Sequence, residues 1–75
     1  PQCLRAFVTV ADTGSFTAAA QRLLRGQSAV SLQVRRLEDQ IGQRLLDRGP
    51  RHVALTPEGE RVIAKARRLL ALNDE

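Results

Sequence analysis

The strongest constraint on the fold of this 75-residue chain is the pattern of residues 15–41. Ser15 suits a helix N-cap, and apolar side chains then recur at helical spacing up to Leu23. Gly26 follows where the chain must turn, and a longer amphipathic stretch begins near Gln27. Its predicted inward stripe consists of Val30, Val34, Leu37 and Ile41, with Gly42 closing the helix. The pattern therefore predicts two helices joined by a tight turn.

The flanking residues predict a helix, a hairpin and a final helix. Residues 4–11 carry apolar side chains at helical spacing, and Gly14 suits the left-handed end of that helix. Residues 45–48 and 52–55 are short strand candidates separated by turn-forming residues. Thr56 and Pro57 then suit the N-cap and first position of a helix ending near Leu72. We expect a mostly α fold, a winged helix-turn-helix with a three-helix core, a small β-hairpin wing and a C-terminal linker or dimerisation helix.

The positive charge of the chain falls on the helix-turn-helix and the segment after it. Residues 21–52 hold seven arginines against three carboxylates, and the rest of the chain is close to neutral. In a helix-turn-helix the second helix enters the major groove of DNA. Arginine suits bidentate contacts with phosphates and guanine edges. With two phenylalanines and neither tryptophan nor tyrosine, the chain lacks the stacking platforms typical of single-strand binding.

The composition argues against several other classes. A single cysteine forms no intramolecular disulfide, and Cys3 and His52 are too few for a metal site. We expect no cofactor and no enzymatic activity, since neither a catalytic set nor a phosphate-binding glycine loop is visible. No membrane span or signal peptide is visible, so a cytoplasmic location is expected. The start at Pro1 and the end inside a helical pattern suggest a fragment of a longer protein.

The chain resembles the N-terminal DNA-binding domain of LysR-type transcriptional regulators over almost its whole length. The residues that carry the resemblance, in the family's order and spacing, are Leu4-x-x-Phe7-x-x-Val10-Ala11, Gly14-Ser15-Phe16, Ala19-Ala20-x-x-Leu23, Gln27-Ser28-Ala29-Val30-Ser31, Leu37-Glu38, Gly42, Leu45, Arg48, Arg51, Leu55-Thr56 and Gly59. It departs from the family at Gly26, where Ser or Thr is common, and at Leu32, where a polar residue is frequent.

The resemblance implies a bacterial regulator with a defined domain order. Residues 1–56 would form the DNA-binding domain, with a recognition helix at about 27–41 and a wing at 46–55. Residues 57–75 would begin the linker helix, which pairs antiparallel with its copy in a homodimer. The full-length protein would further assemble into a tetramer. The effector-binding domain is absent from this chain, so a small-molecule effector would act only through that missing part.

Seven residues are candidates for DNA contact. Gln27, Ser28 and Ser31 match the family's groove-facing residues, although capping of the helix is the alternative. Leu32 either touches a thymine methyl group or is simply exposed. Arg35 suits phosphate or groove contact, with a solvated helix face as the alternative. The remaining two are Arg51, predicted to reach the minor groove or backbone, and Thr17, predicted either to hold a phosphate or to cap its helix.

The last helix is expected to dimerise. It is about 24 Å long, which exceeds the core that so small a domain can offer. Packing back on the same domain is the alternative use of its apolar stripe, which consists of Val62, Ile63, Ala66, Leu69 and Leu70.

The function predicted from the sequence is sequence-specific binding of double-stranded DNA at a pseudo-palindromic operator. A dimer would present two recognition helices about one helical turn apart. The alternative is a winged-helix module that binds another protein and no DNA. The clustering of arginine on residues 21–52 favours DNA, because a protein-binding module does not require it.

Overall fold

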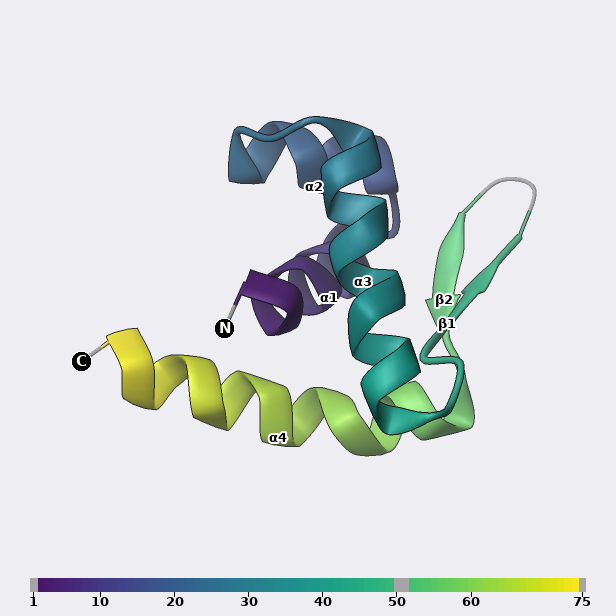
Figure 1. Cartoon of the computed structure of the whole chain (residues 1–75), viewed down its shortest axis with the longest axis vertical. Helices are drawn as coiled ribbons and strands as arrows, with labels where there is room; N and C mark the ends of the chain where they lie inside the picture. Colours follow the sequence, from purple (N-terminus) through teal and green to yellow (C-terminus); the bar gives the residue numbers. More distant parts are fainter. Residues whose placement is uncertain (1, 50–51, 75) are drawn as a thin grey trace.

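The computed structural model of the chain describes residues 2–49 and 52–74 (Figure 1). The elements are α1 (Gln2–Thr13), α2 (Phe16–Leu23), α3 (Gln27–Ile41), β1 (Leu46–Arg48), β2 (Val53–Leu55) and α4 (Pro57–Asp74). This order confirms the predicted winged helix-turn-helix with a C-terminal helix. The strands are shorter than predicted, since Leu45 and His52 lie outside them, and α4 extends past Leu72.

Local chemistry ends α1 and starts α2 as predicted. Gly14 adopts the left-handed conformation with φ of 71°, where glycine carries no Cβ penalty. The side chain of Ser15 then accepts a hydrogen bond of 3.1 Å from the backbone N–H of Ala18. This bond satisfies one of the free donors at the start of α2. The two helices can therefore meet at a sharp angle within two residues.

Gly26 lies in the turn between α2 and α3 as predicted, but the left-handed residue of this turn is another one. Leu24, not Gly26, takes the left-handed conformation, with φ of 57°. Its backbone N–H reaches the carbonyls at the end of α2, and its side chain is 91% exposed. Gly26 has an extended φ of −69° and serves as the N-cap of α3 without a side-chain bond. The reversal therefore depends on a strained leucine, while glycine only begins the next helix.

The core forms where α1, α2 and α3 cross and where α4 and the strands close over them. Its buried members are Ala6, Phe7, Val10, Ala19, Ala20, Val30, Val34, Leu37, Leu45, Leu46, Ile63 and Ala66. Ile41 was predicted to be buried and is 39% exposed. It is the last residue of α3, and the chain turns away at the left-handed Gly42, so the core covers its side chain only in part.

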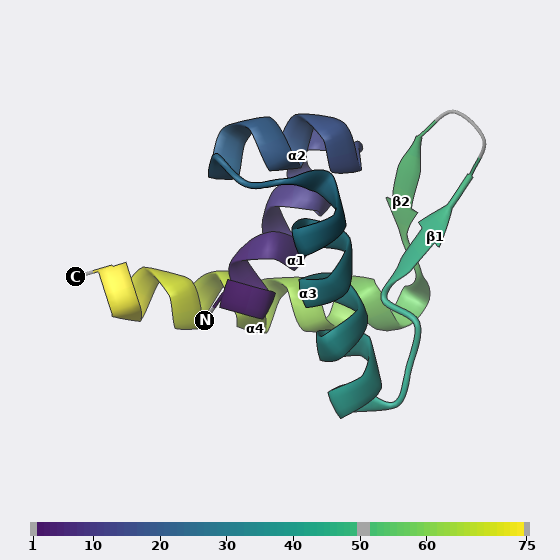
Figure 2. The ribbon, with the colours of Figure 1, turned by 45° about the horizontal axis from the view of Figure 1, so that its top comes forward.

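The wing is an antiparallel pair in which Leu46 faces Leu55 and Arg48 faces Val53. The backbone N–H of Val53 donates to the carbonyl of Gly14 at 3.0 Å. This bond ties β2 to the corner between α1 and α2. Figure 2 shows the hairpin projecting beside α3.

Thr56 and Gly59 fix the start of α4. The hydroxyl of Thr56 donates to the carbonyl of Arg44 at 2.6 Å and accepts from the N–H of Gly59 at 3.0 Å. The predicted N-cap is thus confirmed. A Cβ atom added to Gly59 would lie 2.1 Å from the carbonyl oxygen of Leu45. Only glycine therefore allows α4 to approach the loop before β1 this closely.

Gly59→Ala is expected to destabilise the fold by about 2–3 kcal/mol, because the added methyl group must displace backbone rather than a flexible side chain. Urea unfolding followed by far-ultraviolet circular dichroism measures this loss. Gly26→Ala is the steric control, since apart from its chain neighbours no atom of the described residues lies within 4 Å of the added Cβ; it should lose less, about 1 kcal/mol, from the poorer N-cap. Equal midpoints for the two variants would contradict the proposed steric role of Gly59.

Candidate nucleic-acid interface

One face of α3 is free and polar. Gln27, Ser28 and Arg35 are exposed and Ser31 is half-buried, while Val30 and Val34 on the opposite face are fully buried. Leu32 is 46% exposed. The structure therefore brings five of the predicted contact residues onto one accessible helix face. Because Gly26 offers no side-chain cap, the first N–H groups of α3 have no side-chain partner from their N-cap.

Thr17 and Gln27 are joined directly across the turn. The hydroxyl of Thr17 donates to Oε1 of Gln27 at 3.2 Å, and both residues are exposed. The bond occupies the only hydrogen of the hydroxyl and leaves the amide N–H groups of Gln27 available. Thr17 therefore lies on the same surface as α3 and orients its first side chain.

The predicted wing contact, Arg51, lies outside the described residues. Arg48, which was not among the predicted contact residues, lies in the described part of the wing. The guanidinium of Arg48 lies 4.5 Å from the centroid of the Phe16 ring, within range of a cation–π interaction. Alternation along β1 places Arg48 on the same face as the buried Leu46, so the sequence could have predicted that Arg48 points toward the helices. It could not have identified Phe16 as the contact.

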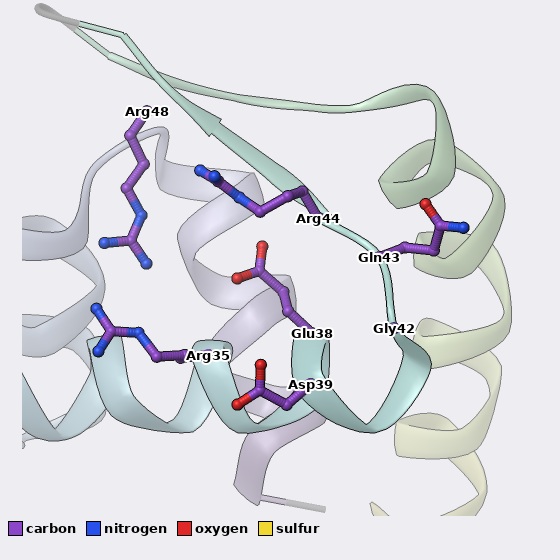
Figure 3. Close-up of a pocket in the computed structure, with 7 residues that line it drawn as sticks. All are labelled: Arg35, Glu38, Asp39, Gly42, Gln43, Arg44 and Arg48. Carbon is purple, nitrogen blue, oxygen red and sulfur yellow. The ribbon is translucent and has the colours of Figure 1, made fainter.

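A hollow of about 480 Å³ separates the later turns of α3 from β1. Figure 3 shows the side chains that line it. Arg35 comes from α3, Arg44 from the loop and Arg48 from β1, so three elements contribute one cation each. The other lining residues are Glu38, Asp39, Gly42 and Gln43.

Glu38 holds the wing to the recognition helix. Its side chain is buried, and Oε2 accepts hydrogen bonds from the backbone N–H groups of Leu45 at 2.9 Å and Leu46 at 3.3 Å. A carboxylate accepting two backbone donors is a strong, charge-assisted arrangement. It fixes the loop that carries Arg44 and starts the strand that carries Arg48.

Glu38→Ala is expected to destabilise the chain by about 1–3 kcal/mol, since it leaves two buried N–H groups without their acceptor. Glu38→Gln retains an acceptor oxygen and should lose less. Asp39→Ala, the exposed neighbouring carboxylate, is the control and should unfold at nearly the wild-type denaturant concentration. If Glu38→Ala behaved like Asp39→Ala, the carboxylate would not be the anchor of the wing.

The apolar side chains of α4 divide into two stripes. Ile63, Ala66 and Leu70 are buried by the same chain. Val62 is half-buried, and Leu69 is 51% and Leu72 69% exposed. The prediction from the sequence had assigned residues of both stripes to the dimer interface. Three of the five predicted dimer residues are thus used inside the domain, and the free apolar surface is the stripe with Leu69 and Leu72.

The described residues contain no group of three or more metal-ligating side chains. None of the helices in residues 2–49 and 52–74 combines the length and apolar character needed to cross a membrane.

The model for the bacterial regulatory helix-turn-helix protein, lysR family, matches residues 1–60. The chain belongs to the LysR family. Its relatives include the HTH-type transcriptional activator AllS of Klebsiella pneumoniae, 43% identical over 99% of this chain and 27% of AllS. The HTH-type transcriptional regulator PecT of Dickeya dadantii is 49% identical over 96% of this chain and 23% of PecT. The chain thus spans about a quarter of these LysR regulators.

Solved structures of LysR proteins share the fold. The crystal structure of the BenM_DBD/catB site 1 DNA complex is 43% identical with a TM-score of 0.91, over 96% of this chain and 81% of that chain. Full-length CbnR complexed with its target DNA is 38% identical with a TM-score of 0.91, over 96% of this chain and 25% of that chain. These LysR neighbours include complexes with DNA.

Proposed function

We propose that this chain is the DNA-binding domain of a bacterial LysR-type transcriptional regulator and binds double-stranded DNA in a sequence-dependent way. The observation that carries the proposal is the free face of α3, which begins with Gln27 and Ser28 and lies beside an arginine-lined hollow. The α3 helix would enter the major groove, and the wing would reach the adjacent minor groove or backbone. Relatives named as regulators and neighbours solved with DNA support this assignment.

The wider role follows from the same proposal. Residues 1–56 would read DNA and residues 57–75 would begin the linker, with a small-molecule effector acting through a domain outside this chain. The regulator would act without catalysis and in the cytoplasm, where bacterial DNA lies. We put the contacts to DNA at Thr17, Gln27, Ser28, Ser31, Leu32, Arg35 and Arg51.

Selection from a random pool of duplexes tests DNA recognition. We expect enrichment of a roughly palindromic site, with an affinity that falls steeply as salt rises because arginines displace counterions from phosphates. Gln27→Ala should relax preference at one position of each half-site, by about 1–3 kcal/mol per contacted base. The absence of any enriched sequence, together with binding of another protein, would favour a protein-interaction module instead.

We also propose that the domain dimerises through the free stripe of α4. Leu69 and Leu72 lie three residues apart on one helix face, and the half-buried Val62 lies on the same face two turns earlier. Exposed leucines at this spacing suit packing against a second helix. Pairing of two copies would bury them and place two α3 helices on one side of a DNA duplex.

Leu69→Glu is expected to shift the chain from dimer to monomer, because a buried charge without a partner opposes association. Sedimentation equilibrium over a range of protein concentrations measures the change. Ala64→Glu alters an exposed position of α4 away from this stripe and should leave the dimer intact. A wild-type chain that stayed monomeric at all accessible concentrations would show that α4 is insufficient for pairing.

A further inference from the structure

The hollow between α3 and the wing gathers three arginines. We name it the arginine cleft and define it by Arg35, Arg44 and Arg48. Their side chains come from three different elements and extend over the same part of α3 (Figure 3). Like charges repel, so a fold that gathers three guanidinium groups in one hollow favours an anion there.

Two carboxylates, Glu38 and Asp39, also line the arginine cleft, so its three arginines leave one positive charge in excess. Oε2 of Glu38 is already bonded to the backbone N–H groups of Leu45 and Leu46. Arg61 pairs with Glu58 and Arg67 with Asp12, and neither pair involves an arginine of the cleft. A phosphate that enters the cleft would therefore meet three guanidinium groups, with one carboxylate oxygen, Oε2 of Glu38, already bonded to the backbone.

Two features hold the cleft in shape before any ligand arrives. The ring of Phe16 lies against the guanidinium of Arg48 and limits its range of positions. The hydrogen bonds that Leu45 and Leu46 donate to Glu38 fix the backbone between Arg44 and Arg48. Preorganised arginines lose less conformational entropy when they bind a planar or tetrahedral oxyanion.

The path of DNA across the domain identifies the anion. If α3 occupies the major groove and the wing approaches the next minor groove, one phosphodiester strand must pass between them. The arginine cleft lies in that interval, since the hairpin stands beside α3 (Figure 2). Phosphate oxygens of this strand are therefore the chemical class that the cleft would meet.

We propose that the arginine cleft is a phosphate clamp for this strand, with Arg44 and Arg48 as ligands beyond the contacts assigned above and Phe16 as a positioning residue for Arg48. The inference rests on the proposed function and goes further, because it assigns affinity without sequence preference to the cleft. The face of α3 that begins at Gln27 is left to distinguish bases.

Arg44→Ala and Arg48→Ala test the clamp through the salt dependence of binding. Each variant should flatten the slope of log affinity against log salt by about 0.9, the value for one phosphate contact on duplex DNA. Each should weaken binding to the selected duplex and to a random duplex by the same factor. Arg68→Ala removes the same charge from an exposed position of α4 and should leave the slope unchanged.

A measurement on the wild-type chain avoids any dependence on variant folding. Neutral methylphosphonate replaces one phosphate at a time in the strand between the two grooves. We expect one or two adjacent positions at which the substitution lowers the affinity of the wild-type protein several-fold. At the same positions it should barely lower the affinity of Arg48→Ala, which has already lost that phosphate contact. Phe16→Leu, which keeps an apolar side chain, should reproduce part of the Arg48→Ala effect and add little to it in the double variant.

The outcomes separate the clamp from the proposed function. Wild-type protein that fails to bind any duplex would overturn the proposed function. The clamp alone would be overturned if the affinity of the wild-type chain for its selected site fell steeply with salt and Arg44→Ala and Arg48→Ala kept the full slope. Loss of discrimination between selected and random duplexes in Arg48→Ala would also overturn it, since a phosphate ligand carries no base preference.

Discussion

The carboxylate of Glu38 is the interaction on which the rest of this surface depends. It is the side chain of a buried position of α3, and it accepts hydrogen bonds from two consecutive backbone N–H groups, those of Leu45 and Leu46. The loop after α3 would otherwise carry buried donors without partners, which is costly. Because the loop is held there, Leu45 and Leu46 reach the core, the hydroxyl of Thr56 reaches the carbonyl of Arg44, and α4 starts against the same loop. One side chain of the recognition helix thus positions both the wing and the linker helix.

Local sequence rules predicted the elements well because their signals are local. Ser15 and Thr56 are caps whose partners lie three residues away, and Gly42 ends α3 with a left-handed φ of 80°. The turn was harder to predict. Gly26 lies in the turn and caps α3 as its composition predicts, but the left-handed conformation falls on Leu24, whose N–H bonds back to the end of α2. Intrinsic preference was overruled there by the geometry that the two packed helices require.

The candidate interface was predictable only as far as one helix face extends. Gln27, Ser28 and Arg35 follow from the period of α3. The contact between Arg48 and Phe16 joins residues far apart in sequence, so no spacing rule reveals it. The same limit applies to α4, where helical periodicity grouped Ile63 and Leu69 although the first is buried by its own chain and the second is exposed. Deciding which side of an amphipathic helix faces its own domain requires knowing where the other helices lie.

The close approach of Gly59 to Leu45 has a mechanical consequence. A linker helix that begins at a loose joint would swing freely and transmit little. Here α4 starts in backbone contact with the loop before β1 and stays packed on the core through Ile63, Ala66 and Leu70. The α4 helix is thus joined to the three-helix core through these side chains, and its 18 residues span about 27 Å. If two copies pair through α4 as proposed, this packing would couple the orientation of α4 to that of α3 in each copy.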